Sequence, residues 1–172
     1  MEKRMNALEV ALNNEMKEHQ FYRKNAERTS NPVGKAMFEQ IAKEELEHHE
    51  RLQQLHDAWD KQKKWPETVP LKASNTAIQS AFRGALKKAP KAGKGDADDL
   101  KAIRTAIDFE AKGAAHYAQL RDASADPKEK AFFDLLANIE HEHFVSLKDT
   151  EEFLTEPAMW YQKFDKTGLD GA

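Results

Sequence analysis

Residues 38–52 read FEQIAKEELEHHERL, and the centre of this stretch is Glu45-Leu46-Glu47-His48. On a helix, residues three apart lie about 60° apart around the axis and about 4.5 Å apart along it. The Glu45 carboxylate and the His48 imidazole can therefore converge on one metal ion. A single Glu-x-x-His is a weak signal, because both residue types are common on solvated helix surfaces. Its meaning depends on the rest of the chain.

The same motif occurs a second time. Shifting the sequence by 95 residues without a gap places Glu45 on Glu140 and His48 on His143. Twelve further positions between residues 7 and 52 are identical under this shift: Ala7/Ala102, Ala11/Ala106, Glu15/Glu110, Lys17/Lys112, Tyr22/Tyr117, Pro32/Pro127, Lys35/Lys130, Ala36/Ala131, Phe38/Phe133, Ala42/Ala137, Glu47/Glu142 and Leu52/Leu147. Unrelated segments give several times fewer identities. The sequence therefore predicts one supersecondary unit that is repeated.

The composition favours a soluble helical domain. Of 172 residues, 33% are charged, and the mean hydropathy is -0.84, so the core must come from amphipathic helices with charged outer faces. The net charge of -3 lacks the basic footprint of a nucleic-acid-binding protein. The absence of cysteine excludes disulfides, thiolate metal sites, iron–sulfur clusters and thiol catalysis. Without a secretory leader or a bilayer-spanning apolar run, we expect a cytoplasmic protein with no membrane partner.

Apolar periodicity and capping residues predict an all-α fold with four long helices. These helices span residues 4–29, 32–64, 98–123 and 127–154. Asn31 before Pro32 and Asp126 before Pro127 are expected N-caps, because proline at the first helical position loses no hydrogen bond. The prediction is a four-helix bundle made of two pseudo-repeated antiparallel helix hairpins.

We expect residues 1–156 to form one bundle domain, in which residues 65–97 are a long crossover between the hairpins. Within the crossover, residues 75–88 are predicted to form a short helix because their apolar side chains share one face. Residues 157–172 carry Trp160, Tyr161 and Phe164. This tail is expected to pack on the bundle or on a partner subunit.

The distances from the turns predict that four carboxylates lie at one level of the bundle. Glu15 lies about fifteen residues before the first turn and Glu45 about fifteen residues after it, so at about 1.5 Å per residue both return to the same height. Glu110 and Glu140 are placed in the same way in the second hairpin. The complete predicted set is Glu15, Glu45, His48, Glu110, Glu140 and His143.

This set of side chains predicts a site for two metal ions. Each ionised carboxylate in a core costs several kcal/mol in lost hydration unless a cation compensates it, and two divalent ions match four carboxylates. One Glu from each of two helices and Glu-x-x-His from each of the other two is the ligand set of di-iron and di-manganese carboxylate bundles. These ligands suit iron, manganese and zinc. The alternative is a metal-free bundle with charged faces.

The residues around this set can be interpreted either as functional or as ordinary core residues. Tyr22 and Tyr117 follow Glu15 and Glu110 by two helical turns and can donate hydrogen bonds to the ligands, or they are ordinary core tyrosines. Small residues leave room near the ions (Ala11, Ala42, Ala106, Ala137), and larger ones form dry walls (Phe38, Leu52, Phe133, Leu147).

Several other polar residues are predicted to lie on the surface. Glu47 and Glu142 point about 160° away from the ligand glutamates. Five histidines lack a histidine at the repeat-related position and are expected to be solvated: His19, His49, His56, His116 and His141.

Four stretches of the chain resemble the rubrerythrin branch of the ferritin-like superfamily. They are the Glu15-to-Tyr22 spacing, the Glu-Glu-Leu-Glu-His run ending at His48, Asp-Phe-Glu ending at Glu110, and Ile-Glu-His-Glu-His ending at His143. The resemblance covers residues 4–154 and implies a ferritin-like fold and a non-haem di-iron protein, usually a dimer, that reduces hydrogen peroxide to water. It further implies that two iron ions are bridged by Glu45 and Glu140, with an oxo bridge on oxidation. The terminal ligands implied are Glu15, Glu110, His48 and His143.

The sequence departs from this family in two respects. Rubrerythrins carry a rubredoxin domain whose iron is held by four cysteines, whereas this sequence has no cysteine, so the expected electron donor is a separate protein such as a rubredoxin. Rubrerythrins also have a seventh ligand, a glutamate one turn beyond the third-helix glutamate, and that position is Gly113 here. The repeat-related residue on the first helix is Glu18, which is either a mirrored seventh ligand or a surface glutamate.

The leading prediction is a peroxidase, and two other functions remain open. One is iron oxidation and storage as in ferritins, which needs a cage of many subunits. The other is a redox sensor whose tail contacts a partner. Dioxygen is the alternative oxidant to hydrogen peroxide, and manganese or zinc are alternatives to iron. The second Glu-x-x-His favours the peroxidase over a ferritin, although bacterioferritins share it.

Overall fold

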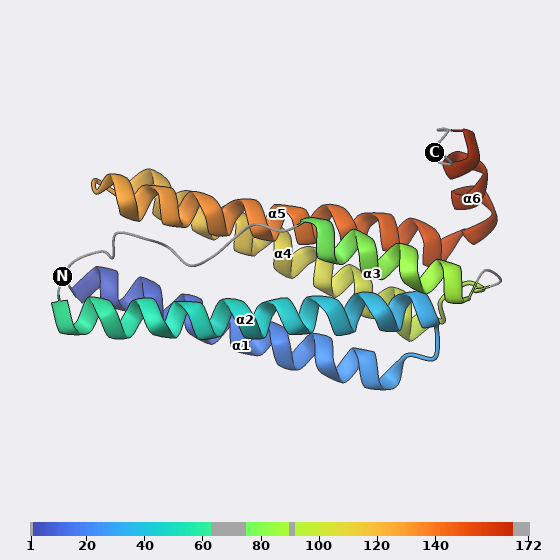
Figure 1. The fold of residues 1–172 in the computed structure, drawn as a ribbon, viewed down its shortest axis with the longest axis horizontal. Helices are drawn as coiled ribbons and strands as arrows, with labels where there is room; N and C mark the ends of the chain where they lie inside the picture. The colour runs from blue at the N-terminus through green and yellow to red at the C-terminus, as the bar shows by residue number, and fades with distance from the viewer. Residues whose placement is uncertain (1, 63–74, 90–91, 167–172) are drawn as a thin grey trace.

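The computed structural model describes residues 2–62, 75–89 and 92–166, and within these ranges the chain forms helices and no strand. The helices are α1 Glu2–Arg28, α2 Pro32–Gln62, α3 Asn75–Lys88, α4 Ala97–Ala123, α5 Pro127–Thr155 and α6 Pro157–Lys166. Four of them, α1, α2, α4 and α5, run the length of the molecule, and α3 lies alongside α2 and α5 (Figure 1). The prediction of an all-α fold is confirmed.

The four long helices are arranged as two antiparallel pairs, α1 with α2 and α4 with α5 (Figure 1). Their ends lie within two residues of the predicted bounds, and α3 has the predicted bounds. The predicted end of the second helix, at residues 63–64, lies outside the described residues. Because each pair is joined by a short turn, the positions of the turns determine which residues of the two helices face each other.

Side-chain caps fix where the long helices begin. The Asn31 side-chain oxygen accepts hydrogen bonds from the backbone N–H of Val33 at 3.0 Å and of Gly34 at 3.1 Å, and Asp126 caps α5 in the same way. A third cap was not predicted. Asp96 and Asp99 form a reciprocal capping box at the start of α4.

The core of the bundle consists of two apolar clusters. The first contains Tyr22, Phe38, Ile103, Leu147 and Phe153 among other residues. The second includes Leu8, Leu52, Leu55, Phe133 and Leu136. Each of the four long helices contributes to both clusters, so each crosses from one to the other near its middle. The four predicted wall residues, Phe38, Leu52, Phe133 and Leu147, are all buried.

Helices α3 and α6 cover one end of the bundle. Ile78 and Phe82 of α3 belong to the first apolar cluster, as does Trp160 of α6. The Trp160 ring meets Phe82 and Phe153 edge to face, and its N–H donates a hydrogen bond of 2.9 Å to Asp149. The side chain of Phe164 and residues 167–172 lie outside the described part of the chain.

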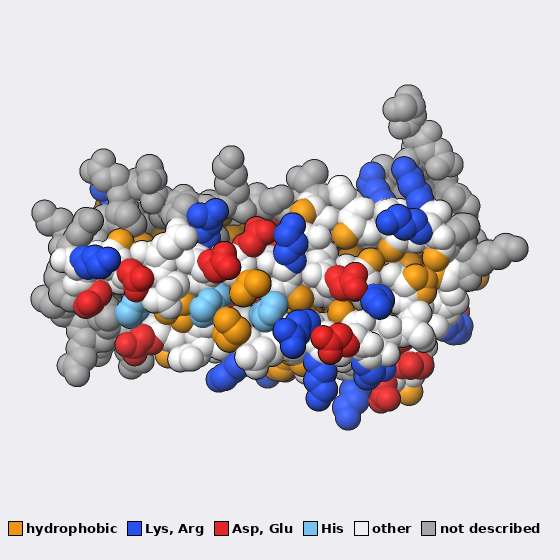
Figure 2. Space-filling model, turned by 60° about the horizontal axis from the view of Figure 1, so that its bottom comes forward, with side chains coloured by type: hydrophobic (Ala, Val, Ile, Leu, Met, Phe, Trp, Pro, Cys, Tyr) orange, Lys and Arg blue, Asp and Glu red, His pale blue; other side chains and the backbone are white. Residues whose placement is uncertain are grey.

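The outer surface is strongly charged, as the composition predicts. Figure 2 shows one long face on which acidic and basic side chains alternate, with histidine and hydrophobic side chains between them. Across the described residues, none of the helices combines the length and the apolar character needed to cross a bilayer.

The Asn31 cap provides a test of the fold. Its side-chain N–H₂ also donates a hydrogen bond of 2.9 Å to the carbonyl of Gly93, which ties the α1–α2 turn to the segment before α4. Asn31→Ala should lower the free energy of unfolding by about 1–2 kcal/mol, since the cap is lost. Asn31→Ser keeps a capping acceptor, loses the bond to Gly93 as alanine does, and should therefore cost less. Urea denaturation measures both, and equal losses would contradict this role of the cap.

Candidate metal centre

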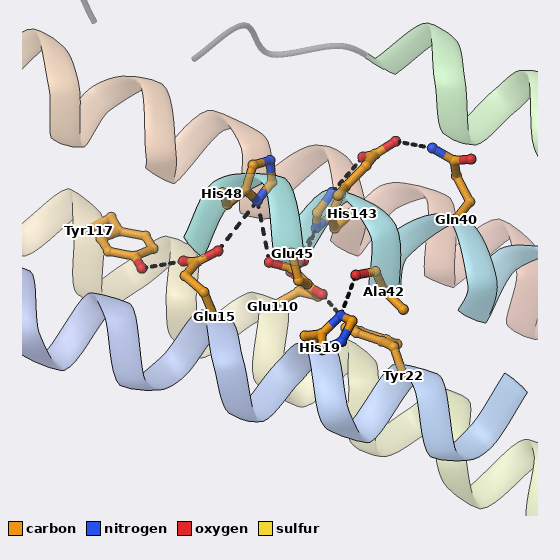
Figure 3. A network of polar contacts seen from close by, with 11 residues as sticks. Glu15, His19, Tyr22, Gln40, Ala42, Glu45, His48, Glu110, Tyr117 and His143 are labelled. Atoms are coloured by element: carbon orange, nitrogen blue, oxygen red, sulfur yellow. Dashed lines mark hydrogen bonds and ion pairs between the residues drawn. The ribbon is translucent and has the colours of Figure 1, made fainter. Parts of the chain in front are cut away.

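Six buried polar side chains separate the two apolar clusters. They come from all four long helices: Glu15 (α1), Glu45 and His48 (α2), Glu110 (α4), Glu140 and His143 (α5). None of them is more than 7% exposed. Figure 3 shows Glu15, Glu45, His48, Glu110 and His143 pointing toward one another between the helices. The structure therefore brings the six predicted ligands into the interior of the bundle.

Three of these residues form a first group that can hold a metal ion: Glu15, Glu45 and His48. The Nδ1 atom of His48 lies 3.3 Å from Glu45 Oε2 and 3.4 Å from Glu15 Oε2. Glu15 and His48 are on neighbouring antiparallel helices, so their approach agrees with the distances counted from the turn.

A second group consists of Glu45, Glu110 and His143. The Nδ1 atom of His143 lies 2.9 Å from Glu45 Oε1 and 3.4 Å from Glu110 Oε2. Glu45 thus presents one oxygen to each histidine, and the two imidazole rings are stacked with their centroids 5.7 Å apart. This is the arrangement of a carboxylate that can be shared between two cations.

A third group is made only of carboxylates, Glu18, Glu110 and Glu140. Glu18 is partly buried on α1 and faces the interior with its carboxylate near those of Glu110 and Glu140. The structure therefore places the candidate seventh ligand next to the six other residues. Glu140 lies on the Glu18 side of the cluster and not in the group of Glu15 and His48.

Gly113 determines where Glu140 can lie. A Cβ atom at this position would be 2.7 Å from Glu140 Oε2, which is closer than real Cβ atoms approach, and 3.1 Å from Glu140 Cδ, which is a tight contact. The missing side chain on α4 leaves the space that the Glu140 carboxylate uses. Gly113 also lines a pocket of about 300 Å³. The other lining residues are Asn14, Lys17, Glu18, Phe109, Lys112 and His116.

The two tyrosines connect the hairpins across the bundle. The Tyr117 hydroxyl of α4 donates a hydrogen bond of 2.6 Å to Glu15 Oε1 of α1, and the Tyr22 hydroxyl of α1 donates one to Glu110 Oε1 of α4 (Figure 3). Burial and the neighbouring carboxylates raise the pKa of both phenols well above the ordinary value. Each phenol therefore keeps its proton and holds one ligand oxygen, which leaves the other oxygen free.

Several oxygen and nitrogen atoms of the cluster show whether the site fits metal ions, because they are buried and make no hydrogen bond. The following buried atoms have no hydrogen-bond partner: Glu15 Oε2, Glu45 Oε1, Glu110 Oε2, both carboxylate oxygens of Glu140, and His143 Nδ1. His143 Nδ1 and Glu45 Oε1 are 2.9 Å apart but lack hydrogen-bonding geometry. Buried polar atoms are otherwise paired in folded proteins, so this concentration of unpaired oxygen and nitrogen atoms fits bound cations.

Burial and mutual repulsion change the protonation of the cluster. Burial, assisted by the charge of Glu45, raises the pKa of Glu15 to about 7. Burial and the same carboxylate raise the pKa of Glu18 to about 10. Burial alone would lower the pKa of His48, but its contacts with Glu15 and Glu45 raise it to about 10. Without metal, protons compensate part of the carboxylate charge, and binding of cations must displace them.

Two polar contacts escaped the sequence analysis. His19 is not solvated as expected, because its Nδ1 lies 2.6 Å from the carbonyl oxygen of Ala42. Glu44 was not singled out, yet its Oε2 lies 3.0 Å from His143 Nε2. The residue 95 positions after Glu44 is Ile139, so a search for repeated ligands could not find it.

The expectation of solvation for the other histidines holds in part. His141 is exposed, whereas His49, His56 and His116 are half-buried. Of the two glutamates predicted to lie on the surface, Glu47 is exposed and Glu142 is partly buried.

The protonation of the cluster predicts how stability depends on pH. For Glu15, Glu18 and His48 the pKa is raised by folding, so between pH 6 and 9 the folded state holds protons that the unfolded chain releases. The free energy of unfolding of the metal-free protein should therefore fall as pH rises. The pKa of Glu45 is lowered by folding, so Glu45 makes the same contribution to the free energy of unfolding at pH 6 and at pH 9.

Thermal unfolding of the chelator-treated protein measures this effect. The Tm should be lower at pH 9 than at pH 6 by about 5 °C or more. Saturating Co²⁺ should raise the Tm more at pH 9, because fewer protons have to leave. A metal-free Tm that rises over this range would contradict the assigned protonation.

Comparison with known proteins agrees with this site. A protein family model described as Rubrerythrin matches residues 6–151, a segment that contains all three groups that could hold a metal ion. Searches of curated proteins and of solved structures gave no match. The 172 residues contain no cysteine, so no rubredoxin domain is evident in them. Because the family match covers most of the chain, the protein belongs to the rubrerythrin family.

Proposed function

We propose that this protein is a di-iron peroxidase that reduces hydrogen peroxide with electrons from a separate donor protein. Family membership indicates a di-iron redox protein. The observation that carries the proposal is the pair of buried Glu–Glu–His groups that share Glu45. Their unpaired oxygen and nitrogen atoms supply ligands for two cations, and iron is a redox-active metal that suits such ligands.

Each residue of the site has a defined role in this proposal. Glu45 would be shared by two ions, since its oxygens face different histidines. Glu140 would supply a second shared carboxylate from the side of Glu18 and Glu110. The terminal ligands are Glu15, His48, Glu110 and His143. The tyrosines orient the terminal carboxylates through their hydrogen bonds, and this orientation reduces the rearrangement needed when an ion binds.

Glu18 is the seventh ligand in this proposal. It lies on α1 opposite Gly113, the position on α4 where a seventh ligand is expected from the family pattern. Glu18 and Gly113 also line the same pocket of about 300 Å³, which borders the site. We assign this pocket as the route by which a molecule as small as hydrogen peroxide reaches the buried carboxylates.

The surrounding residues provide conditions for a two-electron reduction. When bound, a pair of iron ions supplies Lewis acidity and two electrons, so that one hydrogen peroxide with two protons gives two waters. The apolar clusters on both sides keep bulk water away from the ligands. The phenol protons of Tyr22 and Tyr117 remain on oxygen and stabilise the carboxylates next to them.

Single-turnover kinetics test the proposed reaction. The protein is loaded with ferrous iron without oxygen and mixed in separate experiments with hydrogen peroxide and with dioxygen. Oxidation of the iron, followed by visible absorption, should be at least about tenfold faster with peroxide, corresponding to about 1.4 kcal/mol in activation free energy. Equal rates would refute the peroxidase assignment.

The oligomeric state distinguishes this proposal from iron storage. We propose a homodimer, as the family resemblance implies, whereas storage of an iron mineral needs a hollow cage. Size-exclusion chromatography with light scattering of the iron-loaded protein separates the two. A particle of many subunits would favour ferritin-type iron oxidation and storage.

The glycine on α4 offers a sharper mutational test. Gly113→Ala places a methyl group against Glu140, so the carboxylate must move and iron affinity should fall about 10-fold or more. Gly84→Ala on α3 is the matched control, because a Cβ there meets nothing within 4 Å. Alanine is the better helix former at both positions, so a loss confined to Gly113→Ala reflects displacement of Glu140. Unchanged iron binding in both variants would contradict the role of Glu140.

A further inference from the structure

The two histidines of the site differ in what lies behind them. Each turns its Nδ1 atom toward the ligand carboxylates. The Nε2 atom of His143 lies 3.0 Å from Glu44 Oε2. Among the described residues, His48 Nε2 has no corresponding hydrogen bond. The residue related to Glu44 by the 95-residue shift is Ile139, which is apolar and buried.

The contact with Glu44 selects one tautomer of His143. An ionised carboxylate only accepts hydrogen bonds, so the nitrogen that faces it must carry the proton. When His143 is neutral, the proton is on Nε2 and the lone pair is on Nδ1. That lone pair points toward Glu45 and Glu110, where a metal ion needs it.

Glu44 is itself held in position. Its second oxygen, Oε1, accepts a hydrogen bond of 2.7 Å from the Gln40 side chain, one turn earlier on α2. The Glu44 side chain is 14% exposed, whereas that of Glu47 on the same helix is 60% exposed. A carboxylate that is anchored at both oxygens and largely removed from water differs from an ordinary surface glutamate.

We propose that Glu44 is a positioning residue that makes the two metal positions unequal, so that the ion at Glu45, Glu110 and His143 is bound more tightly than the ion at Glu15, Glu45 and His48. A carboxylate behind a metal-bound imidazole orients the ring and raises its basicity, and the loss of such a partner typically costs 10–100-fold in metal affinity. The inference rests on the proposed two-ion site and adds an order of affinity to it.

Calorimetric titration of the metal-free full-length protein with Co²⁺ tests the inference. The natural protein should bind two ions with distinguishable affinities. Glu44→Ala should weaken the tighter site about 10–100-fold and leave the weaker site unchanged. Glu44→Asp should restore part of the loss, and Glu47→Gln is the control for removing an acidic residue from the same helix.

A second measurement reports the tautomer directly. In the Zn²⁺-loaded protein, NMR of ¹⁵N-labelled histidine should show His143 with its proton on Nε2 and in slow exchange with water. Glu44→Ala should accelerate this exchange. Circular dichroism and thermal unfolding establish that each variant is folded before its metal binding is compared.

The outcomes separate the two proposals. If the natural protein binds no Co²⁺ in the bundle, the proposed metal site fails. If it binds two ions but Glu44→Ala leaves both affinities unchanged, or weakens both equally, the site stands and the role of Glu44 is refuted. A loss confined to one ion, together with faster exchange at His143, supports the inference.

Discussion

The burial of four glutamates in one layer of the core is the constraint on which the rest of the structure depends. Glu15, Glu45, Glu110 and Glu140 are each at most 1% exposed, and removing four ionised carboxylates from water is costly unless positive charge or protons compensate them. Phenol hydrogen bonds satisfy only one oxygen each of Glu15 and Glu110. The metal-free cluster therefore depends on bound protons, and divalent cations can take the place of these protons. A bundle selected only for stability would have apolar residues in this layer.

The turns and caps maintain this layer because helix register controls which residues face inward. A shift of one residue rotates a side chain by about 100° around its helix, which would move Glu45 or Glu140 out of the core. Asn31 with Pro32, and Asp126 with Pro127, set the first residues of α2 and α5. The apolar clusters on both sides then hold the helices at a fixed height. The crossed tyrosine bonds join α1 to α4, so the two hairpins are also tied to each other through the site.

Most of the fold and the gathering of six polar residues in the core could be predicted, because they follow simple periodicities. Helical spacing gives the helices, and the repeat separates ligand glutamates from the many surface ones. Residues without a counterpart in the other half of the chain were missed or left open, because the repeat was the signal that identified the candidate ligands. Glu44 has an apolar counterpart, and Glu18 has a glycine as its counterpart. The contact of His19 with a backbone carbonyl depends on how closely α1 and α2 approach, which side-chain patterns do not encode. The capping box of Asp96 and Asp99 was not predicted, because aspartate takes the place of the usual glutamate or glutamine at the third helical position.

Two departures from the repeat act on the candidate ligands of α5. Gly113 gives Glu140 room to lie beside Glu110 and Glu18, and Glu44 holds the outer nitrogen of His143. On α2, Glu45 contacts both histidines, and the Nδ1 atom of His48 faces Glu15 and Glu45. Two identical Glu-x-x-His motifs would give two identical metal positions if their surroundings were identical. Here Glu44 places a negative charge behind the His143 imidazole, and Gly113 leaves space beside the Glu140 carboxylate. The proposed difference in metal affinity between the two positions therefore arises from neighbouring residues and not from the ligands themselves.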